Sequence, residues 1–257
     1  MKKIILSTFL LLNNLSSYAG NWSLGAGALV AANPYVSMKT NILPIPFVSY
    51  QGKNIAVYGP MAKLRYSVNP NNILGLRFQI GMQEFDPKET SNKKINKLNE
   101  RKRVFYIGPY YRFRSDYGQV TTSFGYDVSN RSNGGLLLDL QYAYPFKSQN
   151  RKFFIRPGVG LTWFNNALSR HYYQVSNTES IKSGLAKYQP NSFIQPFLSL
   201  FAGINITKKI FWTNVARLNY LPNSVHNSPM VANKKLTYSL ITGITYEIGE
   251  EKQRFNH

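Results

Sequence analysis

Apolar and polar side chains alternate with a strict two-residue period in one segment of this sequence after another. Between Lys152 and Trp163, one face carries Phe153, Ile155, Pro157, Val159, Leu161 and Trp163, and the other carries Arg156, Gly158, Gly160 and Thr162. Such alternation is typical of a β-strand with one apolar and one polar face. Repeated alternating segments of about ten residues, rich in Tyr, Phe and Trp, predict a transmembrane β-barrel, because each barrel strand exposes alternate residues to lipid.

Residues 1–19 have the three parts of a secretory signal peptide. Lys2 and Lys3 form a positive region, an apolar stretch runs from Ile4 to Leu12, and Ser17-Tyr18-Ala19 is a small-x-Ala cleavage site. The apolar stretch is too short to span a bilayer as a helix, and no run of about 20 apolar residues follows it. We therefore expect cleavage after Ala19, a single barrel domain over residues 20–257, and a location in the outer membrane of a Gram-negative-type bacterium.

Turn-forming residues divide the mature chain into twelve candidate strands of an antiparallel up-and-down barrel. They are Trp22–Ala32, Tyr35–Ile42, Pro46–Gln51, Asn54–Val68, Ile73–Met82, Val104–Ser115, Gly118–Asp127, Leu136–Phe146, Lys152–Trp163, Phe193–Ile204, Ile210–Leu221 and Leu236–Ile248. Short connections alternate with long ones, and bacterial barrels place short turns in the periplasm and long loops outside. The segment 35–51 is expected to form two short strands broken near Leu43-Pro44. If it folds into the lumen instead, ten strands remain.

The chain is strongly basic, with a formal net charge of +20. No helix-turn-helix, zinc-ligand or RNA-binding pattern accompanies this charge, so we expect no nucleic-acid partner. The alternation predicts that eight charged side chains line the lumen: Lys63, Arg65, Arg77, Arg112, Arg114, Asp139, Arg156 and Arg217. Such a lumen would favour anions in a narrow channel. The alternative is that these arginines pair with carboxylates and backbone carbonyls and plug a narrow barrel.

The connection Gln83 to Arg103 holds a second basic group. It contains Lys88, Lys93, Lys94, Lys97, Arg101, Lys102 and Arg103. We expect this loop to contact lipopolysaccharide phosphates and other lipid headgroups of the outer leaflet. The alternative interpretation is a solvated loop.

The candidates for catalysis are weak. The histidines are His171, His226 and the terminal His257. The stretch Arg131-Ser132-Asn133-Gly134 is loosely similar to the serine stretch of outer-membrane phospholipases, but no histidine precedes Ser132. The neighbours His226 and Ser228 lie too close in sequence for a typical triad, which requires long-range geometry. No His, Asp and Glu cluster has metal-ligand spacing. We expect neither enzymatic activity nor a cofactor or metal.

Several ordered segments resemble the MltA-interacting protein family, also called MipA/OmpV. They are Leu24-Gly25-Ala26-Gly27-Ala28, Leu43-Pro44-Ile45-Pro46 with Ser49-Tyr50, Ser183-Gly184-Leu185-Ala186-Lys187-Tyr188, and Arg217-Leu218 with Asn227-Ser228-Pro229-Met230-Val231. The resemblance implies a non-enzymatic outer-membrane barrel that acts as a scaffold for murein-modifying enzymes, joining a peptidoglycan hydrolase to a synthase at the cell envelope. A narrow anion-favouring channel and a surface adhesin are the alternatives.

The family-like segments also lie in two of the long connections, 165–192 and 222–235. Their candidate recognition residues are Ser183, Gly184, Tyr188, Ser228 and Pro229. Gly and Pro at these places favour ordered turns, and ordered loops on a rigid scaffold are common sites of recognition. We expect the two loops to pack on each other over the external mouth, where Tyr172, Tyr173 and Tyr188 would supply apolar area. The alternative is that they merely cap the barrel.

Overall fold

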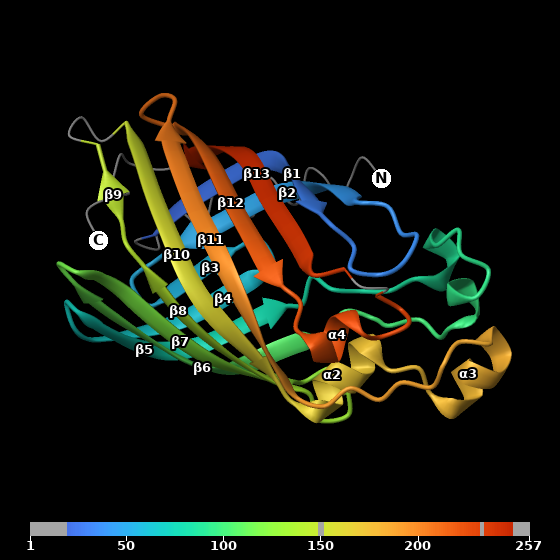
Figure 1. Ribbon diagram of the computed structural model, residues 1–257. Helices are drawn as coiled ribbons and strands as arrows, with labels where there is room; N and C mark the ends of the chain where they lie inside the picture. The colour runs from blue at the N-terminus through green and yellow to red at the C-terminus, as the bar shows by residue number, and fades with distance from the viewer. Residues whose placement is uncertain (1–19, 149–151, 232–233, 249–257) are drawn as a thin grey trace, which may run out of the picture.

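The chain forms a closed antiparallel β-barrel with long loops gathered at one end (Figure 1). The structure is a computed structural model that describes residues 20–148, 152–231 and 234–248. Within these ranges the strands are β1 (Asn21–Ala31), β2 (Asn41–Gln51), β3 (Ile55–Tyr58), β4 (Met61–Asn69), β5 (Asn72–Ile80), β6 (Phe105–Ser115), β7 (Gly118–Asp127), β8 (Leu136–Ala143), β9 (Phe146–Lys147), β10 (Phe153–Phe164), β11 (Phe193–Asn205), β12 (Ile210–Tyr220) and β13 (Leu236–Ile248). The short helices are η2 (Pro87–Glu89), η3 (Ile95–Lys97), α2 (Asn166–Tyr173), α3 (Asn177–Ser183) and α4 (Asn223–His226).

Pairing of neighbouring strands closes the sheet. The first strand, β1, pairs with the last, β13, and β10 pairs with β11, so the sheet closes on itself. β8 and β9 both pair with β10 and are two parts of one strand interrupted at Tyr144 and Pro145. The described residues therefore make a twelve-strand barrel, which confirms the predicted fold class.

The two faces of the wall differ as the alternation predicts. Large apolar side chains are exposed on its outer face, among them Leu138, Leu140, Val159, Leu161, Leu198 and Ile244. In a soluble protein such a band would be an aggregation hazard, whereas in a bilayer it is the lipid contact. The interior holds buried polar side chains such as Ser123, Thr162 and Gln195. No helix of the described chain is long and apolar enough to cross a membrane.

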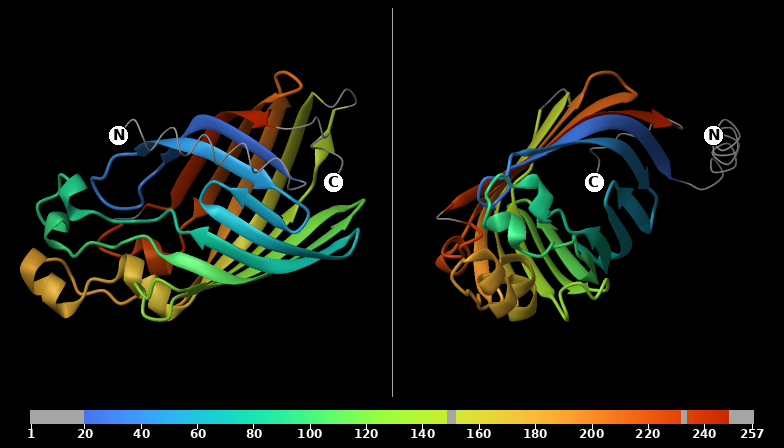
Figure 2. Two further views of the ribbon diagram at one scale, coloured as in Figure 1. Left: turned by 180° about the vertical axis from the view of Figure 1, so that it is seen from behind. Right: turned by 90° about the vertical axis from the view of Figure 1, so that its right-hand side faces the viewer.

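The two ends of the barrel are unlike. Short turns join β4 to β5, β6 to β7 and β11 to β12 at one end, where β1 begins and β13 ends with Trp22 paired to Ile248. The segments 32–40, 81–104, 128–135, 165–192 and 221–235 all connect strands at the other end. Figure 2 shows α2, α3 and the loop between β5 and β6 clustered there. By the general rule for bacterial barrels, the short-turn end faces the periplasm.

The expected break near Leu43-Pro44 is wrong. β2 runs unbroken from Asn41 to Gln51, and Tyr35 lies in the loop before it. The missing strand comes instead from 54–68, predicted as one strand, which turns back at Gly59 to give β3 and β4. Gly59 has a φ of 52°, a left-handed conformation that glycine adopts without strain. Two opposite errors in the predicted boundaries thus leave the strand count unchanged.

The prolines fit inside β2 because one edge of the strand is unpaired there. β3 is short and pairs with β2 only over Ser49–Gln51. The oxygen of Val48 accepts from Gly59, so even-numbered residues of β2 direct their backbone groups away from β1. Pro44 and Pro46 are therefore on the edge that no described strand pairs with. A proline has no N–H, so it removes donors that would have no partner in lipid.

Candidate functional site

The long loops share a hydrophobic core that lies across the external end of the barrel. Each of four loops contributes to it: Tyr35 and Met38 from 32–40; Phe85, Ile95, Leu98 and Val104 from 81–104; Leu168, Tyr172, Tyr173 and Val175 from 165–192; and Leu221, Val225, Met230 and Val231 from 221–235. Tyr106, Leu137 and Phe193 of the barrel wall belong to the same core. We call this assembly the loop cap. Because it continues the barrel interior, the loops are held as a folded unit.

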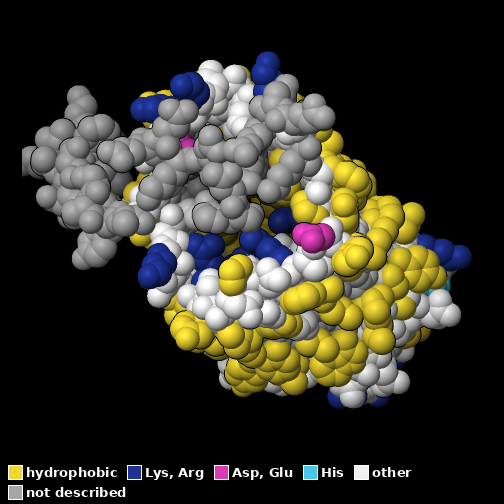
Figure 3. Space-filling model, turned by 90° about the vertical axis from the view of Figure 1, so that its left-hand side faces the viewer, with side chains coloured by type: hydrophobic (Ala, Val, Ile, Leu, Met, Phe, Trp, Pro, Cys, Tyr) yellow, Lys and Arg dark blue, Asp and Glu magenta, His cyan; other side chains and the backbone are white. Residues whose placement is uncertain are grey.

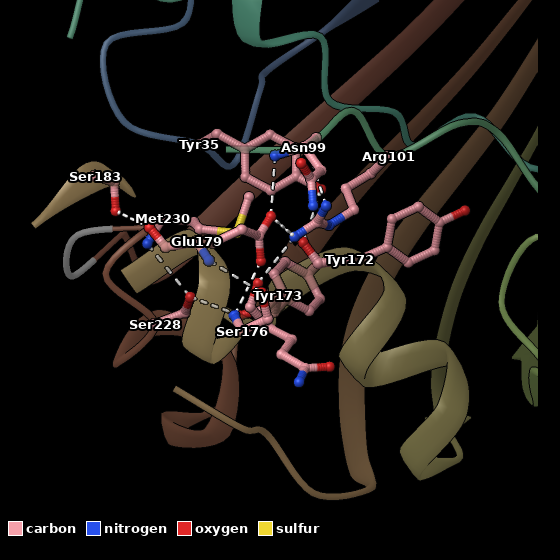
Figure 4. A network of polar contacts seen from close by, with 11 residues as sticks. Tyr35, Asn99, Arg101, Tyr172, Tyr173, Ser176, Glu179, Ser183, Ser228 and Met230 are labelled. Carbon is pink, nitrogen blue, oxygen red and sulfur yellow. Dashed lines mark hydrogen bonds and ion pairs between the residues drawn. The ribbon is translucent and has the colours of Figure 1, made fainter. Parts of the chain in front are cut away.

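A buried ion pair lies at the centre of the polar contacts in the loop cap (Figure 4). Arg101 is 8% exposed and Glu179 is 1% exposed, and Nη2 of Arg101 lies 2.7 Å from Oε1 of Glu179. The guanidinium also donates to the carbonyl oxygens of Asn99 at 2.9 Å and Gln174 at 3.0 Å. The carboxylate accepts from the backbone N–H of Asn99 at 2.9 Å and of Ser176 at 2.9 Å. Both charges are thus compensated, and the pair joins the loop after β5 to the loop after β10.

Local sequence signals explain why α3 presents Glu179 at this point. Ser176 and Glu179 form a reciprocal capping box, in which the Ser176 Oγ accepts from the Glu179 N–H at 3.2 Å. The helix ends at Gly184, which has a φ of 67° and is the left-handed residue favoured after a helix. Ser183 is buried, and its hydroxyl donates to the carbonyl oxygen of Glu179 at 2.6 Å.

The expected contact between the loops 165–192 and 221–235 is present. The Ser228 hydroxyl is buried and donates to the carbonyl oxygen of Tyr173 at 2.8 Å, and the Tyr188 hydroxyl donates to the oxygen of Ser224 at 3.0 Å. Pro229 is partly exposed in the adjoining turn. Ser183 and Gly184 lie at the end of α3, and their hydrogen bonds stay within the loop 165–192 among the described residues. The Ser183 and Ser228 hydroxyls are buried, whereas Gly184 is exposed.

Burial, hydrogen bonds and charge shift the pKa values of two cap residues, Tyr173 and Glu179. Burial raises the pKa of Tyr173 to about 12, although its hydrogen bond with Gln83 lowers it. Burial also acts to raise the pKa of Glu179, but hydrogen bonds from Ser176 and Asn99 and the charge of Arg101 outweigh it, and the pKa is lowered. Glu179 therefore stays ionised, and the ion pair persists at neutral pH.

Two basic groups occupy the barrel interior, and they adjoin where Lys63 of β4 lies directly across from Arg77 of β5. In the first group, Arg77 lies 3.7 Å and Arg217 lies 3.6 Å from the carboxylate of Asp139. The Thr162 hydroxyl donates to Asp139 at 2.6 Å and accepts from Arg217 at 2.7 Å. Since these residues come from β5, β8, β10 and β12, this network bridges opposite walls of the barrel.

The second group, which we call the basic cluster, extends from the level of Arg77 toward the short-turn end. It comprises Lys63, Arg65, Arg112, Arg114 and Arg156. Arg65 donates to the oxygen of Gly52 in the turn after β2, and Arg114 is next to the end of β6. Figure 3 shows Lys and Arg side chains within the hollow at this end. The structure thus brings seven of the predicted basic residues together with Asp139 in two interior groups.

The basic residues of the loop 81–104 differ in burial and in ion pairing. Arg101 is buried in the ion pair, Arg103 pairs with Glu84, and Lys102 pairs with Glu100 at 3.8 Å. The remaining lysines of the loop, Lys88, Lys93, Lys94 and Lys97, are exposed. These four lysines are exposed and have no ion-pair partner among the described residues, so they are best placed to meet an anionic surface.

The residues considered for catalysis have other partners. The Ser132 hydroxyl donates to Asp127 at 2.6 Å, and the Ser228 hydroxyl donates to a backbone oxygen. Nε2 of His226 lies 2.9 Å from the amide oxygen of Asn223, and Nε2 of His171 lies 2.9 Å from the oxygen of Lys102. Across the described residues, no three His, Asp or Glu side chains gather in a way that could hold a metal ion.

Glu179 and Arg101 are the site residues that the sequence analysis missed as partners. The Ser-x-x-Glu pattern at Ser176 signals a helix start and could have placed Glu179. Nothing local marks Arg101 among its basic neighbours.

A closed wall with a lipid-exposed apolar face, short turns at one end and folded loops at the other defines an outer-membrane β-barrel. Residues 24–248 match the family model "MltA-interacting protein MipA", and the chain belongs to this family. It is 31% identical to "MltA-interacting protein" of Escherichia coli strain K12, over 89% of this chain and 90% of that protein. It is 27% identical to "Putative outer membrane protein YiaT" of Escherichia coli O157:H7, over 94% of this chain and 97% of that protein.

Among solved structures, "CymD monoaromatic hydrocarbon channel" aligns over 91% of this chain and 89% of its own length, at 10% identity and a TM-score of 0.40. The predicted family is confirmed.

Proposed function

We propose that this protein is a non-enzymatic scaffold that holds a murein-modifying enzyme at the periplasmic end of its barrel. The observation that carries the proposal is the difference between the two ends. The external end is covered by the loop cap, in which the Arg101–Glu179 ion pair and the Ser228 hydroxyl find their partners inside the cap. At the short-turn end, Lys and Arg side chains are visible within the hollow (Figure 3). In this proposal that end faces the compartment where peptidoglycan lies. The printed name of the relative, "MltA-interacting protein", supports a lytic transglycosylase similar to MltA as the partner.

The charge of the periplasmic rim suggests how such a partner would be recognised. Lys53 and Lys209 are exposed in the turns after β2 and β11. Basic side chains at a rim favour an acidic partner face, since complementary charge raises the association rate and discriminates against wrong partners. In this proposal the same rim brings a peptidoglycan synthase to the hydrolase, so that both act at one point of the envelope.

Binding to a purified MltA-like transglycosylase tests this proposal. We expect the full-length protein in detergent to bind it, with an affinity that falls as salt rises. The double variant Lys53→Glu and Lys209→Glu should bind at least tenfold more weakly. The matched control, Lys93→Glu and Lys94→Glu, changes the same charge at the external end and should bind normally. Absence of binding by the full-length protein, or equal weakening by both variants, would contradict the proposal. A synthase added to the bound pair should join it without displacing the hydrolase.

We also propose that the exposed lysines of the loop 81–104 contact lipopolysaccharide phosphates. Lys93 and Lys94 are adjacent and exposed at the external end. Protein purified from outer membranes should carry less lipopolysaccharide when both are replaced by serine. Equal amounts bound to both proteins would refute this contact.

The loop cap opposes the channel alternative. A channel must be continuous, and the cap core includes the buried wall residues Tyr106 and Phe193 at the mouth. In planar bilayers we expect little conductance from the intact protein. A steady anion-selective current would favour the channel over the scaffold.

A further inference from the structure

Among the described residues, the basic cluster has no carboxylate partner of the kind that Arg77 and Arg217 have. Arg77 and Arg217 share the carboxylate of Asp139, whereas no carboxylate of the described chain forms an ion pair with Lys63, Arg112 or Arg156. The same holds for Arg65 and Arg114. Each of these side chains comes from the inward face of β4, β6 or β10. Positive charges therefore converge from three strands on one interior region.

These groups are close enough to act on one another. The Lys63 ammonium lies within electrostatic range of four arginines, of which Arg77, its direct cross-strand neighbour, acts most strongly, followed by Arg112, Arg156 and Arg65. Arg114 lies within range of Arg156 and Arg65. All of these interactions are repulsive. A barrel interior screens charge less than bulk water does, so such a cluster is stable only when something negative offsets it.

Hydrogen-bond donors in the cluster are also left unused. The Nε atoms of Arg65 and Arg112 are buried and have no hydrogen-bond partner within the part of the chain that the structure describes. The hydroxyl of Tyr110 is likewise buried without a partner, and its ring lies under the Lys63 ammonium at 5.3 Å. Buried polar groups in folded proteins almost always have partners, so unused donors that converge beside unpaired cations mark the place of an acceptor.

Aromatic rings give only partial compensation. Arg156 lies 5.1 Å from the ring centroid of Phe201 and 5.8 Å from that of Phe154. A ring face attracts a cation but carries no net charge. The rings therefore position Arg156 and leave the charge of the cluster unchanged.

We propose that the basic cluster is a binding site for a multiply charged phosphate compound that enters from the periplasmic end. A guanidinium presents a fork of N–H donors that matches two phosphate oxygens, and an ammonium adds a compact charge. A monovalent anion would offset only a small part of the charge, whereas a di- or polyphosphate offsets most of it and accepts several hydrogen bonds. Arg65 touches the turn at Gly52, so the cluster lies close to the short-turn opening. This site is independent of the rim lysines Lys53 and Lys209.

Titration of the full-length protein with sodium pyrophosphate tests the site. Calorimetry in a zwitterionic detergent at low salt should show saturable binding of about one pyrophosphate per chain. The double variant Arg112→Gln and Arg156→Gln should weaken this binding at least tenfold. The control Lys93→Gln and Lys94→Gln removes the same charge from the external loop and should stay within twofold of the parent. Heat-modifiable migration on gels shows whether each variant is a folded barrel.

Two results would overturn the proposal. One is the absence of pyrophosphate binding by the folded parent protein. The other is equal binding by the parent and the folded Arg112→Gln and Arg156→Gln variant. Neither result depends on whether a transglycosylase binds at the rim, so the two proposals fail separately.

A second arm identifies the source of the phosphate. The titration is repeated with the protein in vesicles of phosphatidylcholine alone and in vesicles that also contain phosphatidylglycerol. A lipid phosphate that occupies the site would compete, so pyrophosphate binding would weaken at least tenfold when phosphatidylglycerol is present. A site for soluble phosphate compounds would bind pyrophosphate equally in both vesicles.

Discussion

Replacing Arg101 with methionine should open the loop cap while leaving the barrel intact. Methionine keeps most of the apolar stem of arginine but removes the charge and the donors to Asn99, Gln174 and Glu179. The Glu179 carboxylate, which is 1% exposed, would remain buried with backbone partners only. Removing one partner of a buried ion pair costs about 3 to 5 kcal/mol, because the other charge loses its compensation. We expect the free energy of cap opening to fall by about this amount.

Amide hydrogen exchange measures the opening directly. Within the loop 165–192, the backbone amides of Val175 and Tyr188 donate to each other's carbonyl oxygens at 2.9 Å and 3.0 Å, and neither amide contacts Arg101. A loss of about 3 to 5 kcal/mol corresponds to exchange that is roughly two to four orders of magnitude faster. The control is Lys102→Met, since Lys102 belongs to an exposed ion pair with Glu100 that contributes about 0 to 1 kcal/mol. The reasoning fails if the two variants change the exchange of Val175 and Tyr188 equally.

Four further changes test the faces of the wall and the build of the cap. Leu140→Arg should lower the free energy of unfolding of the barrel in vesicles by about 2 to 4 kcal/mol, because Leu140 faces lipid. The inward-facing Gln141→Arg should cost much less. Equal costs in urea titrations would refute the assigned faces. Acid should loosen the cap, because the pKa of Glu179 is lowered in the folded state. The stabilisation from its ionised form is complete above the pKa of the unfolded chain and is lost as the pH falls through the pKa of the folded protein. Amide exchange in the cap that stays constant as the pH falls through the folded pKa would contradict this. Gly184→Ala should destabilise α3 by about 1 kcal/mol, measured by exchange of its amides, because alanine resists a φ of 67°. Deletion of Asn177 to Lys187 should preserve membrane insertion but raise conductance, and unchanged conductance would show that α3 does not restrict the mouth.

The loop cap shows the limit of local patterns. The expected packing of 165–192 against 221–235 is present in the hydrogen bonds of Ser228 and Tyr188, and the Tyr172 and Tyr173 side chains are buried as expected. The buried pairing of Arg101 with Glu179 joins residues 78 positions apart. Seven basic residues lie between Gln83 and Arg103, and only the packing of four loops decides which of them is buried. The sequence predicts such a loop as a charged surface, while the structure divides it into one buried arginine and an exposed lysine group.

The two-residue period by itself determined the fold class, the lipid and interior faces, and most strand positions from β5 to β13. This period is a local property, because successive side chains of any extended strand point to opposite faces. The tertiary structure decided where the wall is incomplete and which interior charges are compensated. Pro44 and Pro46 signal a break in sequence, yet they fit within β2 because the short β3 leaves that edge unpaired. Likewise, alternation places Arg77 and Arg112 on the same kind of face. Only closure of the barrel brings Asp139 to Arg77, while no carboxylate of the described residues pairs with Arg112.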